Sequence, residues 1–235
     1  MDFPFRSILG ILLYVLPTRP DVASAVTMVA RYQEKPDDTH VVALKRILRY
    51  LKGAPSYLDY TPSPGATPTL DAFADATWAD DPTNRSSTTG FVIRFAGIPI
   101  SWASRKQKAT AKFSTEAEYV ALSDAVSELV WLRQLASDLG APQSKPSLVF
   151  EDNQGAIGLA DQQRSLGRAK HIDVRHHYLR NYIANGSIAL TYIQTSEQLA
   201  DVFTKPLASP AFNKHRRTLR VVVLDTCQDR SAAQV

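Results

Sequence analysis

Apolar residues recur at two different spacings along the chain, and the change of spacing divides the sequence. Before residue 61 they recur every three or four positions, which predicts helices. Between residues 70 and 104 they form short runs bounded by turn residues, which predicts strands, and after residue 114 the two patterns alternate. The expected helices cover residues 8–16, 21–32, 38–52, 114–139, a short stretch after 153, 171–185 and 196–205; the expected strands cover 70–76, 90–96, 98–104, 148–150 and 187–194.

The order of these elements predicts the fold class and the domain limits. Three strands precede the longest helix, and strands and crossover helices alternate afterwards, which is typical of an α/β domain built on one mixed sheet with helices on its faces. A run with three prolines and a glycine, residues 60–68, marks a boundary. We therefore predict a helical fragment over 1–61, a linker over 62–68, the α/β domain over 69–206 and a divergent tail over 207–235.

Composition and charge narrow the possible functions only a little. The chain of 235 residues is 44% hydrophobic, with 27 basic and 23 acidic residues, so a packed core and a polyanionic partner are both compatible with it. The lone Cys227 excludes an internal disulfide framework and a cysteine-based zinc site. The apolar run over 8–16 imitates a signal peptide, but Pro17 and Pro20 interrupt the adjoining segment, and the run is too short to span a bilayer. We expect a cytoplasmic or nuclear protein that is not secreted and has no membrane partner.

Two acidic residues lie at predicted strand ends. Asp152 follows the apolar strand over 148–150, and ligand sites of α/β sheets lie at the carboxyl ends of strands. The alternative is that Asp152 caps the next helix. Asp75 ends the first strand and shares a strand face with Phe73. Either carboxylate could therefore be a metal ligand.

Two further acids lie on predicted helices. Glu118 heads the apolar stripe of the long helix, although the spacing of Thr115 and Glu118 also fits a capping box. Asp201 lies one turn into the last helix, where the helix dipole also favours an acid. If all four acids converge on one sheet edge, their mutual repulsion requires divalent cations. Two Mg²⁺ ions about 4 Å apart are the usual arrangement for in-line phosphoryl transfer, and Mn²⁺ also suits such oxygen ligands. We expect Asp152, at the end of the central strand, to contact both ions.

A cluster of basic residues precedes the long helix: Arg105, Lys106, Lys108 and Lys112. We predict that these residues contact nucleic-acid phosphates, and the alternative is a solvated surface turn. A second basic surface, on the helix over 38–52, consists of Lys45, Arg46, Arg49 and Lys52. Three histidines, His171, His176 and His177, lie on one predicted helix. Neither His176 nor His177 is three or four positions from His171, which argues against a zinc site.

Seven segments of the sequence resemble one family. ADATWADD (74–81), SSTTGFV (86–92), ISWASRKQ (100–107), STEAEYVAL (114–122), EDNQGAI (151–157), KHIDVRHH (170–177) and QLADVFTK (198–205) are similar to the ribonuclease H domain of copia-type LTR retrotransposon polyproteins. Upstream, RSILGILLY (6–14), TRPD (18–21) and LRYLKG (48–53) resemble the segment that joins the reverse transcriptase to that domain.

The resemblance implies a fold, an activity and a set of residues. It implies a ribonuclease H-like fold with a five-stranded mixed sheet, and metal-dependent cleavage of the RNA strand of RNA–DNA hybrids. It places the catalytic acids and metal ligands at Asp75, Glu118, Asp152 and Asp201. The partners it implies are the hybrid and the remainder of the polyprotein, including the reverse transcriptase. An alternative is a degraded fragment that binds nucleic acid without catalysis, and a transposase or integrase is disfavoured because those enzymes order their acids Asp, Asp, Glu.

Overall fold

The computed structural model describes residues 3–108, 110–161 and 170–224, with the backbone alone for 170–176. The chain forms two compact units. One consists of residues 61–215, and the other combines residues 1–60 with residues from 216 onward. The domain limits drawn from the sequence stay a prediction.

The larger unit is built on one five-stranded mixed sheet, as predicted. Its strands are β2 (Leu70–Thr77), β3 (Thr88–Phe95), β4 (Ile98–Lys106), β5 (Ser147–Glu151) and β6 (Ile188–Tyr192), in the spatial order β4-β3-β2-β5-β6. The β2–β3 and β3–β4 pairs are antiparallel, whereas β2–β5 and β5–β6 are parallel. The carboxyl ends of β2 and β5 therefore lie at the same edge of the sheet.

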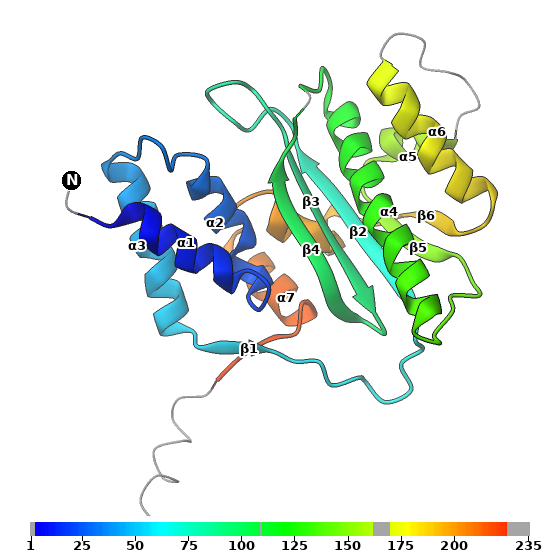
Figure 1. Cartoon of the computed structure of the whole chain (residues 1–235), viewed down its shortest axis with the longest axis horizontal. Coiled ribbons are helices and arrows are strands. Elements are labelled where there is room, and N and C mark those ends of the chain that lie inside the picture. Colours follow the sequence, from blue (N-terminus) through cyan, green and yellow to red (C-terminus); the bar gives the residue numbers. More distant parts are fainter. Residues whose placement is uncertain (1–2, 109, 162–169, 225–235) are drawn as a thin grey trace, which may run out of the picture. The chain divides into compact units, whose positions relative to one another are not determined.

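Helices cover one face of this sheet (Figure 1). They are α4 (Ser114–Asp138), α5 (Gln154–Asp161) and α6 (Lys170–Ala184). The core lies between them and the sheet, with Leu70, Phe91, Leu122, Leu129 and Val149 all at most 2% exposed. Side chains alternate between the two faces of β2, and its small residues Ala72 and Ala74 face this core. Their small size lets α4 approach the strand closely. Helix α4 ends before Gly140, which takes a φ of 82°, in agreement with the predicted stop.

The prediction of a helix over 196–205 is wrong. Two short 3₁₀ helices replace it: η2 (Thr195–Glu197) and η3 (Leu199–Phe203). The interruption is Gln198, whose backbone is extended and whose side-chain oxygen accepts from the amide of Ala200. The Gln198 amide nitrogen in turn donates to the carbonyl oxygen of Ala74 on β2. Tertiary hydrogen bonding to the sheet thus overrides the helical pattern of the sequence.

A close approach at Gly90 fixes η3 against strand β3. A Cβ added at Gly90 would lie 2.5 Å from Cγ2 of Thr204 and 2.8 Å from Cβ of Phe203. Only glycine leaves room for this contact, since any side chain would keep the backbone of β3 further away. Figure 1 shows this segment on the face of the sheet opposite to α4.

The smaller unit has a helical core of its own. It contains α1 (Phe5–Val15), η1 (Pro20–Val22), α2 (Ala23–Ala30) and α3 (Asp38–Gly53), followed by β1 (Ser56–Leu58), and the predicted helix over 21–32 thus divides into η1 and α2. Phe5, Leu9 and Leu12 are buried, so the apolar run that imitates a signal peptide packs as part of a core helix. In the described part of the chain, no helix is both long and apolar enough to cross a membrane.

The described part of the predicted tail is structured. Helix α7 (Ser209–Thr218) runs across the boundary between the units, and β7 (Val221–Val223) pairs antiparallel with β1. Within the smaller unit, Arg19 donates two hydrogen bonds to the carboxylate of Asp21, and the Tyr50 hydroxyl donates to the same carboxylate at 2.6 Å. Residues 225–235 lie outside the described residues.

Candidate active site

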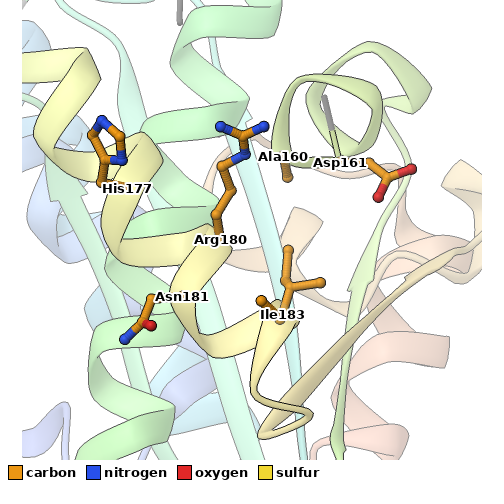
Figure 2. Close-up of a pocket in the computed structure, with 7 residues that line it drawn as sticks. Ala160, Asp161, His177, Arg180, Asn181 and Ile183 are labelled. Atoms are coloured by element: carbon orange, nitrogen blue, oxygen red, sulfur yellow. The ribbon is translucent and has the colours of Figure 1, made fainter. Parts of the chain in front are cut away.

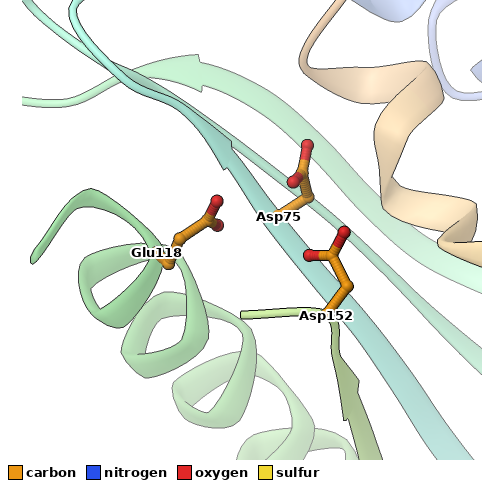
Figure 3. A group of neighbouring side chains, drawn as sticks. All are labelled: Asp75, Glu118 and Asp152. Atoms are coloured by element: carbon orange, nitrogen blue, oxygen red, sulfur yellow. The ribbon is translucent and has the colours of Figure 1, made fainter. Parts of the chain in front are cut away.

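Three of the four predicted acids meet at one edge of the sheet. Asp75 comes from β2, Glu118 from the first turns of α4, and Asp152 follows β5 directly. One carboxylate oxygen of each lies within 4.8 Å of the others, and the three side chains point toward one another (Figure 3). Within the described residues, this is the group of His, Cys, Asp and Glu side chains whose spacing fits a metal ion.

The helix-capping alternatives for Glu118 and Asp152 are both wrong. Helix α4 has Phe113 at its N-cap with no side-chain cap, and Glu118 Oε2 accepts instead from the backbone amide of Ala76 at 2.6 Å. At the start of α5, the capping hydrogen bond goes from the Ala156 amide to Oδ1 of Asn153. Glu118 is therefore attached to the end of β2, and the Asp152 carboxylate is directed to its acidic neighbours.

The fourth acid, Asp201, lies beside this group with a lysine between them. Lys205 Nζ is 2.8 Å from Asp201 Oδ1 and 3.9 Å from Asp75 Oδ2. The hydroxyl of Thr204 donates a short hydrogen bond to Asp75 Oδ2. Asp201 Oδ1 is buried, and its charged partner is the ammonium group of Lys205. A buried carboxylate oxygen that already faces a cation is also a suitable ligand for a hard metal ion.

Burial and mutual repulsion disfavour the ionised form of Glu118, Asp201 and Asp75. Burial, together with Asp75 and Asp152, raises the pKa of Glu118 to about 9. Burial and Asp75 raise the pKa of Asp201 to about 7 despite the nearby Lys205. Burial also raises the pKa of Asp75, against the opposing effects of Lys205 and Thr204. A divalent cation would stabilise the ionised carboxylates, and their all-oxygen donor set fits Mg²⁺ or Mn²⁺.

The sequence places a fifth acid, Glu151, beside Asp152 at the strand end but predicts no role for it. Its side chain is 0% exposed, Oε1 accepts from the Asn153 amide at 3.1 Å, and Oε2 has no hydrogen-bond partner. Burial and the charge of Glu118 raise its pKa above the ordinary range. The sequence signal is parity, because Glu151 shares a strand face with Val149, and in the structure this face is buried.

These pKa shifts predict how stability depends on pH in the absence of metal. Glu118 ionises near pH 4.5 when unfolded and near pH 9 when folded, so the folded chain holds more protons and loses stability as pH rises between these values. The melting temperature in EDTA should therefore fall from pH 7 to pH 9, and Mg²⁺ should raise it more at pH 9. Glu118→Gln should flatten this dependence. A melting temperature in EDTA that stays constant or rises over the same interval would contradict the raised pKa of Glu118.

All four residues of the predicted basic cluster are exposed, and Lys106 also forms an ion pair within the protein. Lys106 Nζ is 2.7 Å from Oδ2 of the buried Asp81, and this ion pair holds the loop between β2 and β3. Arg105 is exposed at the end of β4 with its guanidinium 5.2 Å from the ring centroid of Phe91. Lys108 and Lys112 are exposed in the segment before α4. Arg105, Lys108 and Lys112 are thus available for contacts, whereas Lys106 also has a structural role.

Helix α6, which carries His177, lines a surface depression that is separate from the acidic site. A shallow depression of about 610 Å³ lies between α5 and α6 and includes Asp161, His177 and Arg180 (Figure 2). The side chains of His171 and His176 lie outside the described residues. The depression contains none of the converging acids, and the described residues place no second metal-binding group there.

Comparison with known proteins places the chain among transposon polyproteins. The chain is 39% identical over 218 residues to the retrovirus-related Pol polyprotein from transposon RE2 of Arabidopsis thaliana, which covers 93% of this chain and 15% of that protein. It is 41% identical over 203 residues to the Pol polyprotein from transposon TNT 1-94 of Nicotiana tabacum, covering 86% of this chain and again 15% of the relative. The chain thus spans about one seventh of these relatives. No protein-family model matches it.

Solved structures are similar at low sequence identity. A foamy viral protease-reverse transcriptase in complex with double-stranded DNA aligns with a TM-score of 0.50 and 18% identity, covering 81% of this chain and 32% of that one. LC11-RNase H1, isolated from compost, aligns with a TM-score of 0.45 and 15% identity, covering 63% of this chain and 98% of that one.

The fold and the acidic edge define a class of protein. The sheet order β4-β3-β2-β5-β6, with acids at the ends of β2 and β5 and on α4, gives a ribonuclease H-like fold, as the resemblance implied. Over 86–93% of its length, the chain is homologous to copia-type retrotransposon Pol polyproteins.

Proposed function

We propose that the chain is a metal-dependent endoribonuclease that cleaves the RNA strand of RNA–DNA hybrids during retrotransposon replication. The observation that carries this proposal is the convergence of Asp75, Glu118 and Asp152, from three separate elements, to within 4.8 Å. The similarity to transposon Pol polyproteins and the ribonuclease H-like fold support the same role. The partners would be the hybrid and the rest of the polyprotein.

The carboxylates would hold two divalent ions, and the arrangement favours Asp75 as the shared ligand. Asp75 belongs to the acidic trio, and its other neighbours are Thr204 and Lys205 of the segment that carries Asp201. Asp152, expected from sequence to contact both ions, belongs to the trio and follows β5, the strand next to β2. Bound at these positions, two ions would supply an activated water and stabilise the leaving oxygen of the scissile phosphate.

The protein's own contribution is rigid placement of charge. The Ala76 amide orients Glu118, and the Thr204 hydroxyl orients Asp75, so neither ligand must reorganise when the substrate phosphate arrives. The alternative, a fragment that binds nucleic acid without catalysis, would not require this buried acidic arrangement to persist.

An assay on four labelled substrates tests the proposed activity. The wild-type chain should cleave the RNA strand of an RNA–DNA hybrid in Mg²⁺, and it should leave the DNA strand, single-stranded RNA and duplex DNA intact. EDTA should abolish cleavage. Binding of the hybrid without cleavage in Mg²⁺ and in Mn²⁺ would instead support the non-catalytic alternative.

The exposed basic residues should set hybrid affinity. Changing Arg105, Lys108 and Lys112 together to Ala should raise KM about equally for every hybrid sequence and lower the salt slope by roughly three, since each phosphate contact contributes about one. Single-turnover cleavage at saturating hybrid should change little. Lys106 is left intact because its loss would also release Asp81.

The matched control is Lys145→Ala, which removes an exposed charge from the same unit. It should leave KM and the salt slope unchanged. If the triple variant also leaves both unchanged, the basic cluster is a solvated turn. The surface that binds the hybrid would then be sought on the exposed basic residues of α3, which are Lys45, Arg46, Arg49 and Lys52.

A further inference from the structure

Lys205 is unusual among the lysines of this chain because it reaches into the acidic edge. Its Nζ contacts Asp201 Oδ1 at 2.8 Å and lies 3.9 Å from Asp75 Oδ2, while its side chain remains 35% exposed. Burial lowers its pKa, but Asp75 and Asp201 outweigh that effect and raise it, so the ammonium stays charged. A single positive charge is therefore located between two of the proposed metal ligands.

The backbone that carries Lys205 is fixed from several directions. The Thr77 hydroxyl donates to the carbonyl oxygen of Thr204 at 3.1 Å, and the Lys205 amide donates to the carbonyl oxygen of Asp201, also at 3.1 Å. The contact at Gly90 holds the preceding turn of η3 against β3. Pro206 then restricts the backbone of Lys205 itself. This lysine is thus positioned by the fold and is not a mobile surface side chain.

We propose that Lys205 is a built-in cation of the acidic site, which neutralises Asp201 and Asp75 when no metal is bound and which a divalent ion must displace from Asp201 in order to bind. The inference rests on the proposed function, because it requires these acids to be metal ligands. It makes Lys205 a positioning residue that sets metal affinity.

Two opposite effects follow from electrostatics. Without metal, loss of the ammonium leaves two buried carboxylates less compensated, which destabilises the fold. With metal, loss of the ammonium removes a positive charge within a few ångströms of the incoming ion, which strengthens binding. An ordinary surface salt bridge would produce neither effect to a large extent.

The experiment compares Lys205→Met, which keeps the length of the apolar stem, with Lys205→Arg, which keeps the charge. Thermal unfolding in EDTA measures the first effect, and calorimetric titration with Mn²⁺ measures the second. Lys205→Met should melt at a lower temperature in EDTA and bind Mn²⁺ about tenfold more tightly than the wild type. Lys205→Arg should stay near the wild type in both measurements.

The matched control is Lys214→Met, which removes the exposed ion pair of Lys214 with Glu197 from the same unit and should not alter Mn²⁺ affinity. A Lys205→Met chain that unfolds in EDTA and folds when Mn²⁺ is added supports the proposal; one that stays unfolded in both overturns it. Unchanged or weaker Mn²⁺ binding by folded Lys205→Met also overturns it, as does an equal shift in Lys205→Arg. If the wild type itself binds no Mn²⁺, the proposed function fails before the role of Lys205 is reached.

Discussion

Replacing Asp152 by Asn should reduce Mg²⁺-dependent cleavage of a hybrid by more than about a hundredfold, because loss even of an outer partner of a metal ligand commonly costs ten- to a hundredfold. The Asn side chain keeps the shape of Asp but carries no charge, so metal binding suffers while packing does not. The melting temperature in EDTA should stay the same or rise, since the repulsion of Asp75 and Glu118 falls with the removed charge. Loss of activity with retained stability separates a ligand from a structural residue.

The control for this variant is Asp161→Asn, which removes an exposed carboxylate at the end of α5 in the same unit. Its cleavage rate and melting temperature should match the wild type. Asp152→Asn that cleaves at a rate near that of the wild type would remove Asp152 from the proposed site. A large fall in its melting temperature would instead indicate that the carboxylate supports the fold.

Gly90→Ala should be the most damaging small substitution in the larger unit. The new methyl group would meet Thr204 Cγ2 at 2.5 Å and Phe203 Cβ at 2.8 Å, and the carbonyl oxygen of Ala200 at 3.1 Å. Overpacking of this kind destabilises a protein by about 1–3 kcal/mol. The movement that relieves it would displace η3, which carries Asp201, so cleavage should fall together with stability.

Gly158→Ala is the matched comparison, because a Cβ at that position in α5 meets nothing within 4 Å. Alanine there should leave stability unchanged or raise it slightly, as expected for a glycine in a helix. Equal effects of Gly90→Ala and Gly158→Ala on the melting temperature would show that the close approach of η3 to β3 does not limit the fold.

The sheet could be predicted from the sequence because its signals are local. The alternation on β2 and the hairpin of β3 and β4 around Gly97 appear directly in the pattern of apolar and turn residues. The long α4 was equally evident from its apolar stripe and its stop at Gly140. The order of the elements indicated an α/β mixed sheet, and the resemblance implied the ribonuclease H-like fold. Placing each acid on its element made the convergence of Asp75, Glu118 and Asp152 a hypothesis, and the resemblance implied that they form one site.

The features that could not be predicted depend on contacts between distant parts of the chain. The break at Gln198 results from its hydrogen bond to Ala74, which is 124 positions away in sequence. The contact of Lys205 with the acidic site also depends on distant parts of the chain. In the sequence, its i, i+4 spacing from Asp201 indicates only an ordinary helix pair, and the packing of η3 on β3 becomes evident only in the structure. Pairing of β7 with β1 was also beyond prediction, since three-residue strands leave too weak a pattern.

Four carboxylates of this chain are proposed to form one site for two divalent ions. Anomalous scattering from crystals grown with Mn²⁺ and a hybrid that carries a 2′-deoxy residue at the cleavage position locates such ions directly. We expect two Mn²⁺ peaks about 4 Å apart, with Asp75 contacting both and with Glu118, Asp152 and Asp201 completing the ligands. We also expect Lys205 Nζ to have moved away from Asp201. Crystals that contain the hybrid but show no Mn²⁺ peak within ligand distance of these carboxylates would contradict the claim.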